Sequence, residues 1–157
     1  LSIRRQRQMC IRDRCVFDLR TQKVCEIHPD LGSLERIFCV DNAVFYLGAT
    51  DSDYPSIYRY DFLEKTKDRR PKILVESAAP QELTPQIISK PTHFEFPSSS
   101  GSSAYGLFYA PMNPSFSAPN GEAPPLIVNV HGGPTGTARS GLNPLHQFWT
   151  CLSLILI

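Results

Sequence analysis

The sequence predicts a mixed fold, in which an array of short antiparallel strands is followed by the start of an α/β sheet. Three observations predict it. Strand-and-turn patterns fill residues 15–75, a passage punctuated by proline follows, and an apolar run at 126–130 ends abruptly at His131, Gly132 and Gly133. Alternating patterns are typical of half-exposed strands, whereas a continuous apolar strand is typical of a sheet covered on both faces.

The expected strands of the first part are separated by turn-forming residues, among them the pair Asp41-Asn42. They cover residues 15–19, 24–28, 36–40, 43–49, 56–62 and 72–77. Two pieces, "VFDLRTQKV" and "YRYDFLEKTKDRRPKIL", each place an Asp near a strand end before a polar turn. Asp18 and Asp61 are roughly 43 positions apart, which suits one blade of a β-propeller. Any antiparallel sheet with similar hairpins is the alternative.

A change of composition near residues 80–90 predicts a boundary between two domains. Pro80, Pro85 and Pro91 exclude a long helix, so the passage is expected to be a connector. Two strands are expected next, "THFEFP" and "AYGLFYAP", joined at a hairpin tip by "SSSGSS". The run "PLIVNV" is then expected to be a strand buried on both faces.

The composition excludes several classes of protein. The chain has 157 residues and a net charge of +1, which gives no reason to expect a nucleic-acid partner. Its five cysteines form no C-x-x-C pair, so we expect reduced thiols and a cytoplasmic protein, with an organelle as the alternative. No apolar stretch is long enough to span a bilayer, so no membrane association is expected. No metal or other cofactor is implied.

The residues that end the apolar run point to acyl-transfer chemistry. Glycine permits a positive φ, and a loop of this kind can aim backbone N–H groups at the oxyanion of a tetrahedral intermediate. An H-G-G-G loop after the third strand does so in α/β-hydrolases. Here Pro134, which has no N–H, replaces the third glycine, so the donors would be on His131, Gly132 or Gly133. An ordinary tight turn is the alternative. His131 is not expected to act as a general base, because no candidate nucleophile is near it in the sequence.

The passages "ISKPTHFEFPSSSGSSAYGLFYAPMNPSF", "PPLIVNVHGGPTG" and "NPLHQFWT" resemble the prolyl oligopeptidase family of serine peptidases, above all its acylaminoacyl-peptidase and dipeptidyl-peptidase-like branch. The resemblance implies the end of a β-propeller at 15–84, followed by the first strands of an α/β-hydrolase domain at 85–150, with a helix at 147–149. It also implies an oxyanion loop at 131–133, and hydrolysis of short or N-acylated peptides through an acyl-enzyme.

One departure from that family matters. Its nucleophile lies in a G-x-S-x-G elbow after this loop, with Asp and His later still. The sequence has no G-x-S-x-G, and His28, His93 and His146 are expected to be turn, strand and helix-surface residues. Nucleophile, acid and base are thus missing, and the chain is expected to be an inactive fragment. The alternatives are a carboxylesterase-type α/β-hydrolase and a non-catalytic propeller module that binds a partner.

Both ends of the chain differ from the rest. "RQRQMCIRDR" and "CLSLILI" resemble peptides translated from sequencing-adapter DNA. We therefore expect residues 1–14 and 151–157 to be non-native tails. The alternative is a basic N-terminal tail together with a short apolar helix end.

Overall fold

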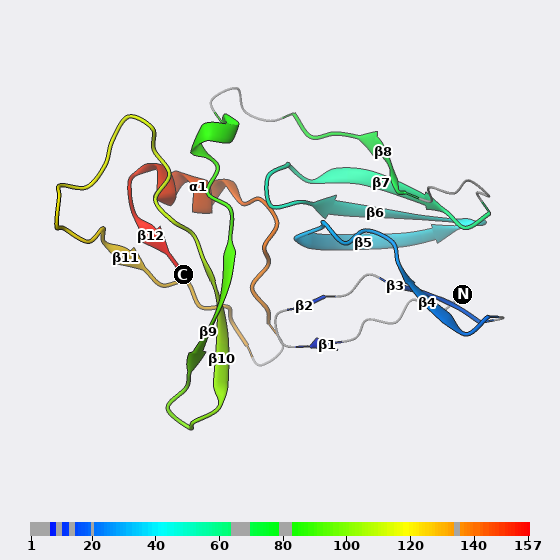
Figure 1. Ribbon diagram of the computed structural model, residues 1–157. Helices are drawn as coiled ribbons and strands as arrows, with labels where there is room; N and C mark the ends of the chain where they lie inside the picture. Colours follow the sequence, from blue (N-terminus) through cyan, green and yellow to red (C-terminus); the bar gives the residue numbers. More distant parts are fainter. Residues whose placement is uncertain are drawn as a thin grey trace.

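The computed structural model describes residues 7–8, 11–12, 15–19, 21–63, 70–78, 83–133 and 136–157, and of residues 7–8 and 11–12 only the backbone. In this part of the chain the fold is mostly sheet, with one α-helix (Figure 1). The strands are β1 (Arg7–Gln8), β2 (Ile11–Arg12), β3 (Cys15–Asp18), β4 (Lys23–Glu26), β5 (Ser33–Val40), β6 (Ala43–Ala49), β7 (Ser56–Asp61), β8 (Lys72–Val75), β9 (Thr92–Pro97), β10 (Ser103–Phe108), β11 (Leu126–Ile127) and β12 (Ile155–Leu156). The helices are η1 (Pro85–Ile87) and α1 (Pro144–Cys151).

The largest sheet is an antiparallel meander in the order β5-β6-β7-β8. The predicted turn at Asp41-Asn42 joins its first two strands, and Asp41 has a φ of 50°, as tight hairpin turns require. Strand β7 alternates buried and exposed residues, which confirms the half-exposed strand expected there. A meander of four strands has the topology of a propeller blade.

The core of this part lies on one face of the meander and is rich in tyrosine. Val16, Leu31, Val44, Tyr46, Tyr58 and Tyr60 form it. The rings of Tyr46 and Tyr58 are stacked with centroids 5.4 Å apart. His28 packs edge-on against Tyr58 and lies 3.0 Å from the Tyr46 hydroxyl. His28 therefore has a structural role in this core, next to the turn where the sequence placed it.

The hairpin β3–β4 shows how an aspartate at a strand end fixes the following turn. The Asp18 carboxylate accepts a hydrogen bond from the backbone N–H of Thr21, at 3.3 Å. The equivalent Asp61, at the end of β7, instead accepts hydrogen bonds from Arg59, the shorter at 2.7 Å. The two pieces of similar sequence thus both form antiparallel strand pairs, β3–β4 and β7–β8, and the two aspartates accept hydrogen bonds from different partners.

The second part of the chain contains a hairpin and a βαβ unit. Strands β9 and β10 pair antiparallel, and Gly101, with a φ of 79°, lies in the "SSSGSS" tip as expected. Strands β11 and β12 pair in parallel, and α1 connects them. The Asn143 side chain caps α1 by accepting from the backbone N–H of Leu145, and Pro144 occupies the first turn. The helix contains the predicted segment 147–149.

Strand β12 falls within the segment 151–157. Tyr109 pairs with Leu156 through an N–H···O bond of 2.8 Å, and Leu156 packs with Leu107 and Tyr109 in a small second core. The last residues thus pair with β11 on one side and form an isolated bridge to Tyr109 on the other. That this segment is a non-native tail stays a prediction, as it does for residues 1–14.

The two parts touch along a strap, which we define as residues 136–142. The backbone N–H of Leu142 donates to the Thr50 carbonyl at 2.7 Å, and Arg139 forms an ion pair with Glu35. Gly32 and Gly141 meet so closely that a Cβ on Gly32 would lie 2.3 Å from the Gly141 nitrogen. The strap therefore lies directly against the start of the meander.

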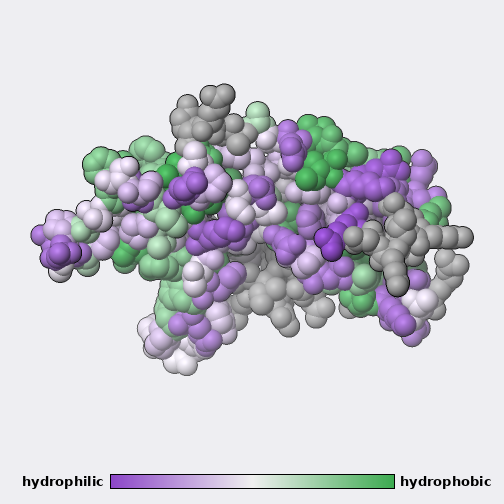
Figure 2. Space-filling view, turned by 45° about the horizontal axis from the view of Figure 1, so that its top comes forward, coloured by the Kyte–Doolittle hydropathy of each residue, from purple (hydrophilic) through white to green (hydrophobic). Residues whose placement is uncertain are grey.

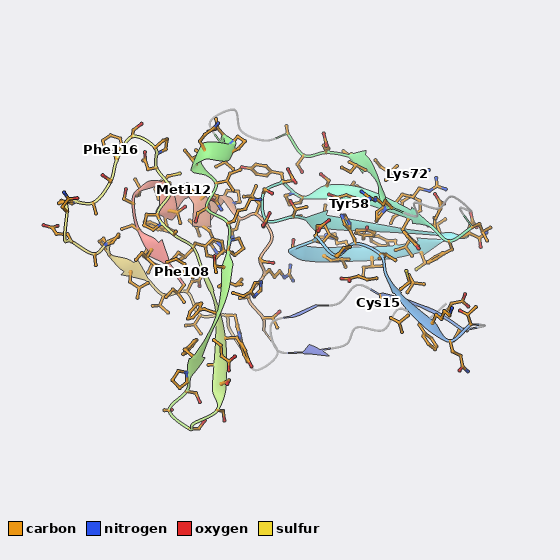
Figure 3. All side chains as sticks on the ribbon, in the orientation of Figure 1. Cys15, Tyr58, Lys72, Phe108, Met112 and Phe116 are labelled. Atoms are coloured by element: carbon orange, nitrogen blue, oxygen red, sulfur yellow. The ribbon has the colours of Figure 1, made fainter. Side chains whose placement is uncertain are left out.

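Several strands expose apolar side chains to solvent. On β8, Ile73, Leu74 and Val75 are each about half exposed, and hydrophobic surface is visible over this end of the molecule in Figure 2. Phe116 projects from the long loop before β11, far from the labelled Tyr58 of the meander (Figure 3). None of the helices in the described ranges is long and apolar enough to span a bilayer.

Candidate oxyanion loop

The predicted loop, residues 131–133, is separated from the end of β11 by residues 128–130. Asn129 donates to the Ile157 carbonyl at 2.6 Å, after which the chain leaves the sheet. His131, Gly132 and Gly133 are all exposed. Gly133 has a φ of 70°, in the region that glycine adopts without strain. The loop is therefore a turn with a special backbone conformation, in the place where the sequence predicts one.

Gly136 packs closely against the backbone of this loop. Its N–H donates to the Gly133 carbonyl at 3.4 Å. A Cβ on Gly136 would lie 2.4 Å from the Gly132 carbonyl oxygen and 2.6 Å from Nδ1 of His131. Only glycine can come so near, because both contacts are below the distance that real Cβ atoms adopt. Gly136 was not predicted as a site residue, although it belongs to a cluster of Gly, Pro and Thr that is typical of a loop.

The backbone N–H groups of residues 131–133 donate to no acceptor in the described part of the chain. Among the hydrogen bonds of the described residues, none uses the N–H of His131, Gly132 or Gly133. Exposed, unpaired N–H groups on neighbouring residues can bind an anionic oxygen. Pro134 lies outside the described residues. The role of residues 131–133 in an oxyanion hole stays a prediction, and the geometry is compatible with it.

The strand before the loop differs from its prediction. Only Leu126 and Ile127 have strand geometry, and Val128 and Val130 are 61% and 78% exposed. The prediction that 125–130 is a strand buried on both faces is therefore wrong for this chain. The physical reason is that β11 has one neighbour in the described part of the chain, β12, and burial of both faces needs more strands and covering helices.

His146 also differs from its prediction as a helix-surface residue. Its ring packs edge-on against the ring of Tyr109, with centroids 5.0 Å apart, and its Nδ1 is buried without a hydrogen-bond partner. Burial lowers the pKa of His146. Burial, with a contribution from Asp51, raises the pKa of Tyr109 to about 12. The side of α1 that carries His146 therefore faces the protein interior. His93, by contrast, is exposed on β9, as expected.

We expect the stability of the chain to fall as the pH drops below about 6.5, the ordinary pKa of histidine. Because the pKa of His146 is lowered in the folded chain, the unfolded chain takes up a proton on this residue at a higher pH than the folded chain does. The contribution of neutral His146 to the free energy of unfolding is therefore fully present above about pH 6.5 and is lost as the pH falls toward the lowered pKa. Urea unfolding at about pH 7.5 and about pH 5 measures the loss. The loss of stability on acidification should be smaller in His146→Gln and unchanged in the matched control His93→Gln. If His146→Gln lost as much stability as the parent chain, His146 would not be the residue responsible.

Other chemistry is sparse in the described residues. Their cysteines, Cys15, Cys25, Cys39 and Cys151, form no disulfide with one another. Within the ranges that the structure describes, His, Cys, Asp and Glu side chains form no group of three or more that could hold a metal ion. What the arrangement offers is therefore a set of backbone donors on a glycine loop, at the end of the first strand of a βαβ unit.

Comparison with known proteins finds this fold inside larger solved structures. No protein-family model and no curated protein matches the sequence. Among solved structures, the chain is similar to a puromycin hydrolase and to its serine-to-alanine mutant complexed with PGG, each with a TM-score of 0.79 and 16% identity. It is also similar to a puromycin-hydrolysing peptidase of Mycobacterium tuberculosis, with a TM-score of 0.79 and 23% identity.

These matches cover most of this chain but little of the larger proteins. They include 92% of this chain and 21% or 22% of the matched chains, so the chain spans about a fifth of their length. At these identities the likeness shows the fold alone. The array of strands followed by a βαβ unit is therefore an arrangement found inside larger peptidases and hydrolases.

Proposed function

We propose that the chain is a piece of a serine peptidase of the prolyl oligopeptidase family. In this proposal residues 15–84 are the C-terminal part of a β-propeller, and residues 85–150 open an α/β-hydrolase domain. Three features support it: the blade-like meander, the βαβ unit after it, and the fold shared with puromycin-hydrolysing proteins. The observation that carries the proposal is the exposed glycine loop at 131–133, separated from β11 by residues 128–130, whose N–H groups are unpaired among the described residues.

The loop would act on the tetrahedral intermediate of peptide hydrolysis. A serine oxygen attacks the scissile carbonyl carbon, a histidine takes the serine proton, and the carbonyl oxygen becomes an anion. The N–H groups of Gly132 and Gly133 would donate to that anion, and the carbonyl re-forms as the amine leaves with a proton from the histidine. Serine, histidine and aspartate would be supplied by sequence beyond this chain. A propeller over the site would restrict substrates to short or N-acylated peptides, and the chain alone would be inactive.

The experiment that tests the proposal is to sequence the transcript outward from the codons for "PLIVNVHGGP". We expect the reading frame to continue after Trp149 into a G-x-S-x-G elbow, with Asp and His after it. The encoded protein should then cleave an N-acetylated peptide anilide, an amide bond that esterases leave intact. A frame that encodes no such serine would overturn the peptidase proposal, and cleavage of a p-nitrophenyl ester with no cleavage of the anilide would favour a carboxylesterase.

A substitution in the loop tests its catalytic role in that longer protein. Gly133→Ala places a side chain at a φ of 70°, which costs about 1–2 kcal/mol and should tilt the loop N–H groups. We expect kcat to fall about tenfold, which corresponds to about 1.4 kcal/mol, with little change in KM. Gly121→Ala is the matched control, because Gly121 has a φ of 85° and open space around it in a different loop. Equal losses in both variants would show that the effect is general destabilisation.

A further inference from the structure

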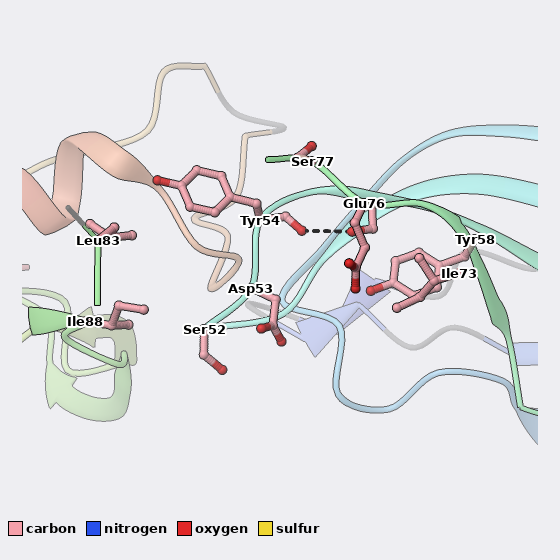
Figure 4. A pocket seen from close by; sticks show the side chains of 10 residues that line it. Ser52, Asp53, Tyr54, Tyr58, Ile73, Glu76, Ser77, Leu83 and Ile88 are labelled. Atoms are coloured by element: carbon pink, nitrogen blue, oxygen red, sulfur yellow. Dashed lines mark hydrogen bonds between the residues drawn. The ribbon is translucent and has the colours of Figure 1, made fainter. Parts of the chain in front are cut away.

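A cavity of about 340 Å³ lies away from the glycine loop, where the meander meets the connector. The loop before β7 forms one wall, the end of β8 a second, and Leu83 and Ile88 of the connector a third (Figure 4). Its volume is in the range of pockets that bind small molecules, which is roughly 300–1,000 Å³. Nothing in the proposed peptidase chemistry uses this cavity.

The cavity is negatively charged. Asp53 and Glu76 line it and, among the described residues, neither forms an ion pair. Thr50 Oγ1 donates to Asp53 Oδ2 at 2.7 Å, which fixes that carboxylate. Burial is the main cause that raises the pKa of Tyr58, and Asp53 and Glu76 add to it. Both carboxylates therefore act on the same phenol, and Figure 4 shows the Glu76 carboxylate beside its hydroxyl.

The remaining walls combine tyrosine rings, hydroxyl groups and apolar side chains. Tyr54 and Tyr58 supply the rings, and the hydroxyl oxygen of Tyr54 is buried without a hydrogen-bond partner in the described part. Ile73, Leu83 and Ile88 supply the apolar surface. Tyrosine faces attract cations, and carboxylate and hydroxyl oxygens accept hydrogen bonds from an ammonium group. The apolar wall suits the hydrocarbon stem that such a group carries.

We propose that this cavity binds a primary ammonium group carried on a short apolar stem, as in a small alkylamine or a lysine side chain. A divalent metal ion fits less well, because hard cations take six or more oxygen ligands and the described residues place no third carboxylate, histidine or cysteine there. An anion is excluded by two unpaired carboxylates. The inference does not depend on the proposed peptidase activity.

Titration of the 157-residue chain with three probes tests the inference, with binding followed by NMR shifts of the Tyr58 ring and by calorimetry. The probes are n-butylammonium, Nα-acetyl-lysine-N-methylamide and the neutral 1-pentanol, which has a similar size. We expect both amines to bind, with dissociation constants around millimolar, and 1-pentanol to bind at least about tenfold more weakly. Tighter binding of the lysine derivative would identify a peptide as the source of the ammonium group, and tighter binding of n-butylammonium a free amine.

Charge-removing variants complete the test. Glu76→Gln and Asp53→Asn should each weaken amine binding about tenfold, with no effect on 1-pentanol. Glu122→Gln, in the exposed loop before β11, is the matched control and should bind as the parent chain does. If Asp53→Asn disturbs the fold, Glu76→Gln alone decides, because Glu76 is exposed at the end of β8. Equal binding of amines and alcohol, or no binding of amines, overturns the inference.

Discussion

Replacing Gln147 with Leu should lower the free energy of unfolding by about 3 kcal/mol. Gln147 is only 1% exposed, and its amide completes two hydrogen bonds with one residue of the connector. The N–H of Ser89 donates to Oε1 at 2.7 Å, and Nε2 donates to the Ser89 carbonyl at 3.1 Å. Leucine has a similar size and keeps the apolar contacts, but it leaves both buried backbone groups of Ser89 without a partner. Each such group costs about 1–3 kcal/mol.

Urea unfolding of the 157-residue chain measures this effect, with the change read from the midpoint at constant slope. Leu145→Gln is the matched control on the same helix, because Leu145 is 57% exposed and its side chain lies outside the core. It should change stability by no more than about 0.5 kcal/mol. If Gln147→Leu were as mild as this control, α1 would not be fastened to the connector through Ser89.

The hydrogen bonds between Gln147 and Ser89 explain why α1 could be predicted from the sequence while its contact with the connector could not. The resemblance of "NPLHQFWT" predicted a helix at 147–149, and the Asn143 cap with Pro144 in the first turn shows why it forms there. The partner of Gln147, however, is 58 positions away in the chain. No local pattern identifies such a pair, because the sequence around a single glutamine does not show whether its side chain is buried or exposed.

The strands were predictable for a related reason. Alternation on β7 and the turn at Asp41-Asn42 are local signals, and the structure has strands and turn where they indicate. Whether a strand is covered on both faces depends on distant elements. The apolar run at 125–130 therefore predicted a strand correctly at Leu126–Ile127 but its burial wrongly. His146 shows the same limit, since the side of a short helix that faces inward is set by its tertiary contacts.

The candidate site was predictable to the extent that its chemistry is local. A histidine and two glycines after an apolar run mark a backbone turn, and Gly133 has the positive φ that such a turn requires. The contact that shapes the loop, Gly136 against His131, needs three-dimensional information. The same holds for the cavity near Tyr58, because one of its two carboxylates is in the loop before β7 and the other directly follows β8.

Replacing Gly32 with Ala should lower the free energy of unfolding by about 3 kcal/mol or more, because the added methyl group meets backbone atoms. Its Cβ would lie 2.3 Å from the nitrogen of Gly141 and 2.5 Å from the carbonyl carbon of Ser140. Backbone cannot rotate away as a side chain can, so the strap 136–142 must move. That movement should break the 2.7 Å bond from Leu142 N–H to the Thr50 carbonyl, which joins the strap to the meander.

Gly132→Ala is the control for this experiment, because a Cβ there meets nothing within 4 Å and the residue has no positive φ. Its stability should equal that of the parent chain or exceed it slightly, since alanine restricts the unfolded chain more than glycine does. Urea unfolding gives both energies, and the NMR shift of the Leu142 amide reports whether the strap has moved. A Gly32→Ala chain of unchanged stability would mean that the strap does not lie against the meander, and the two parts would then have to be held together by the connector alone.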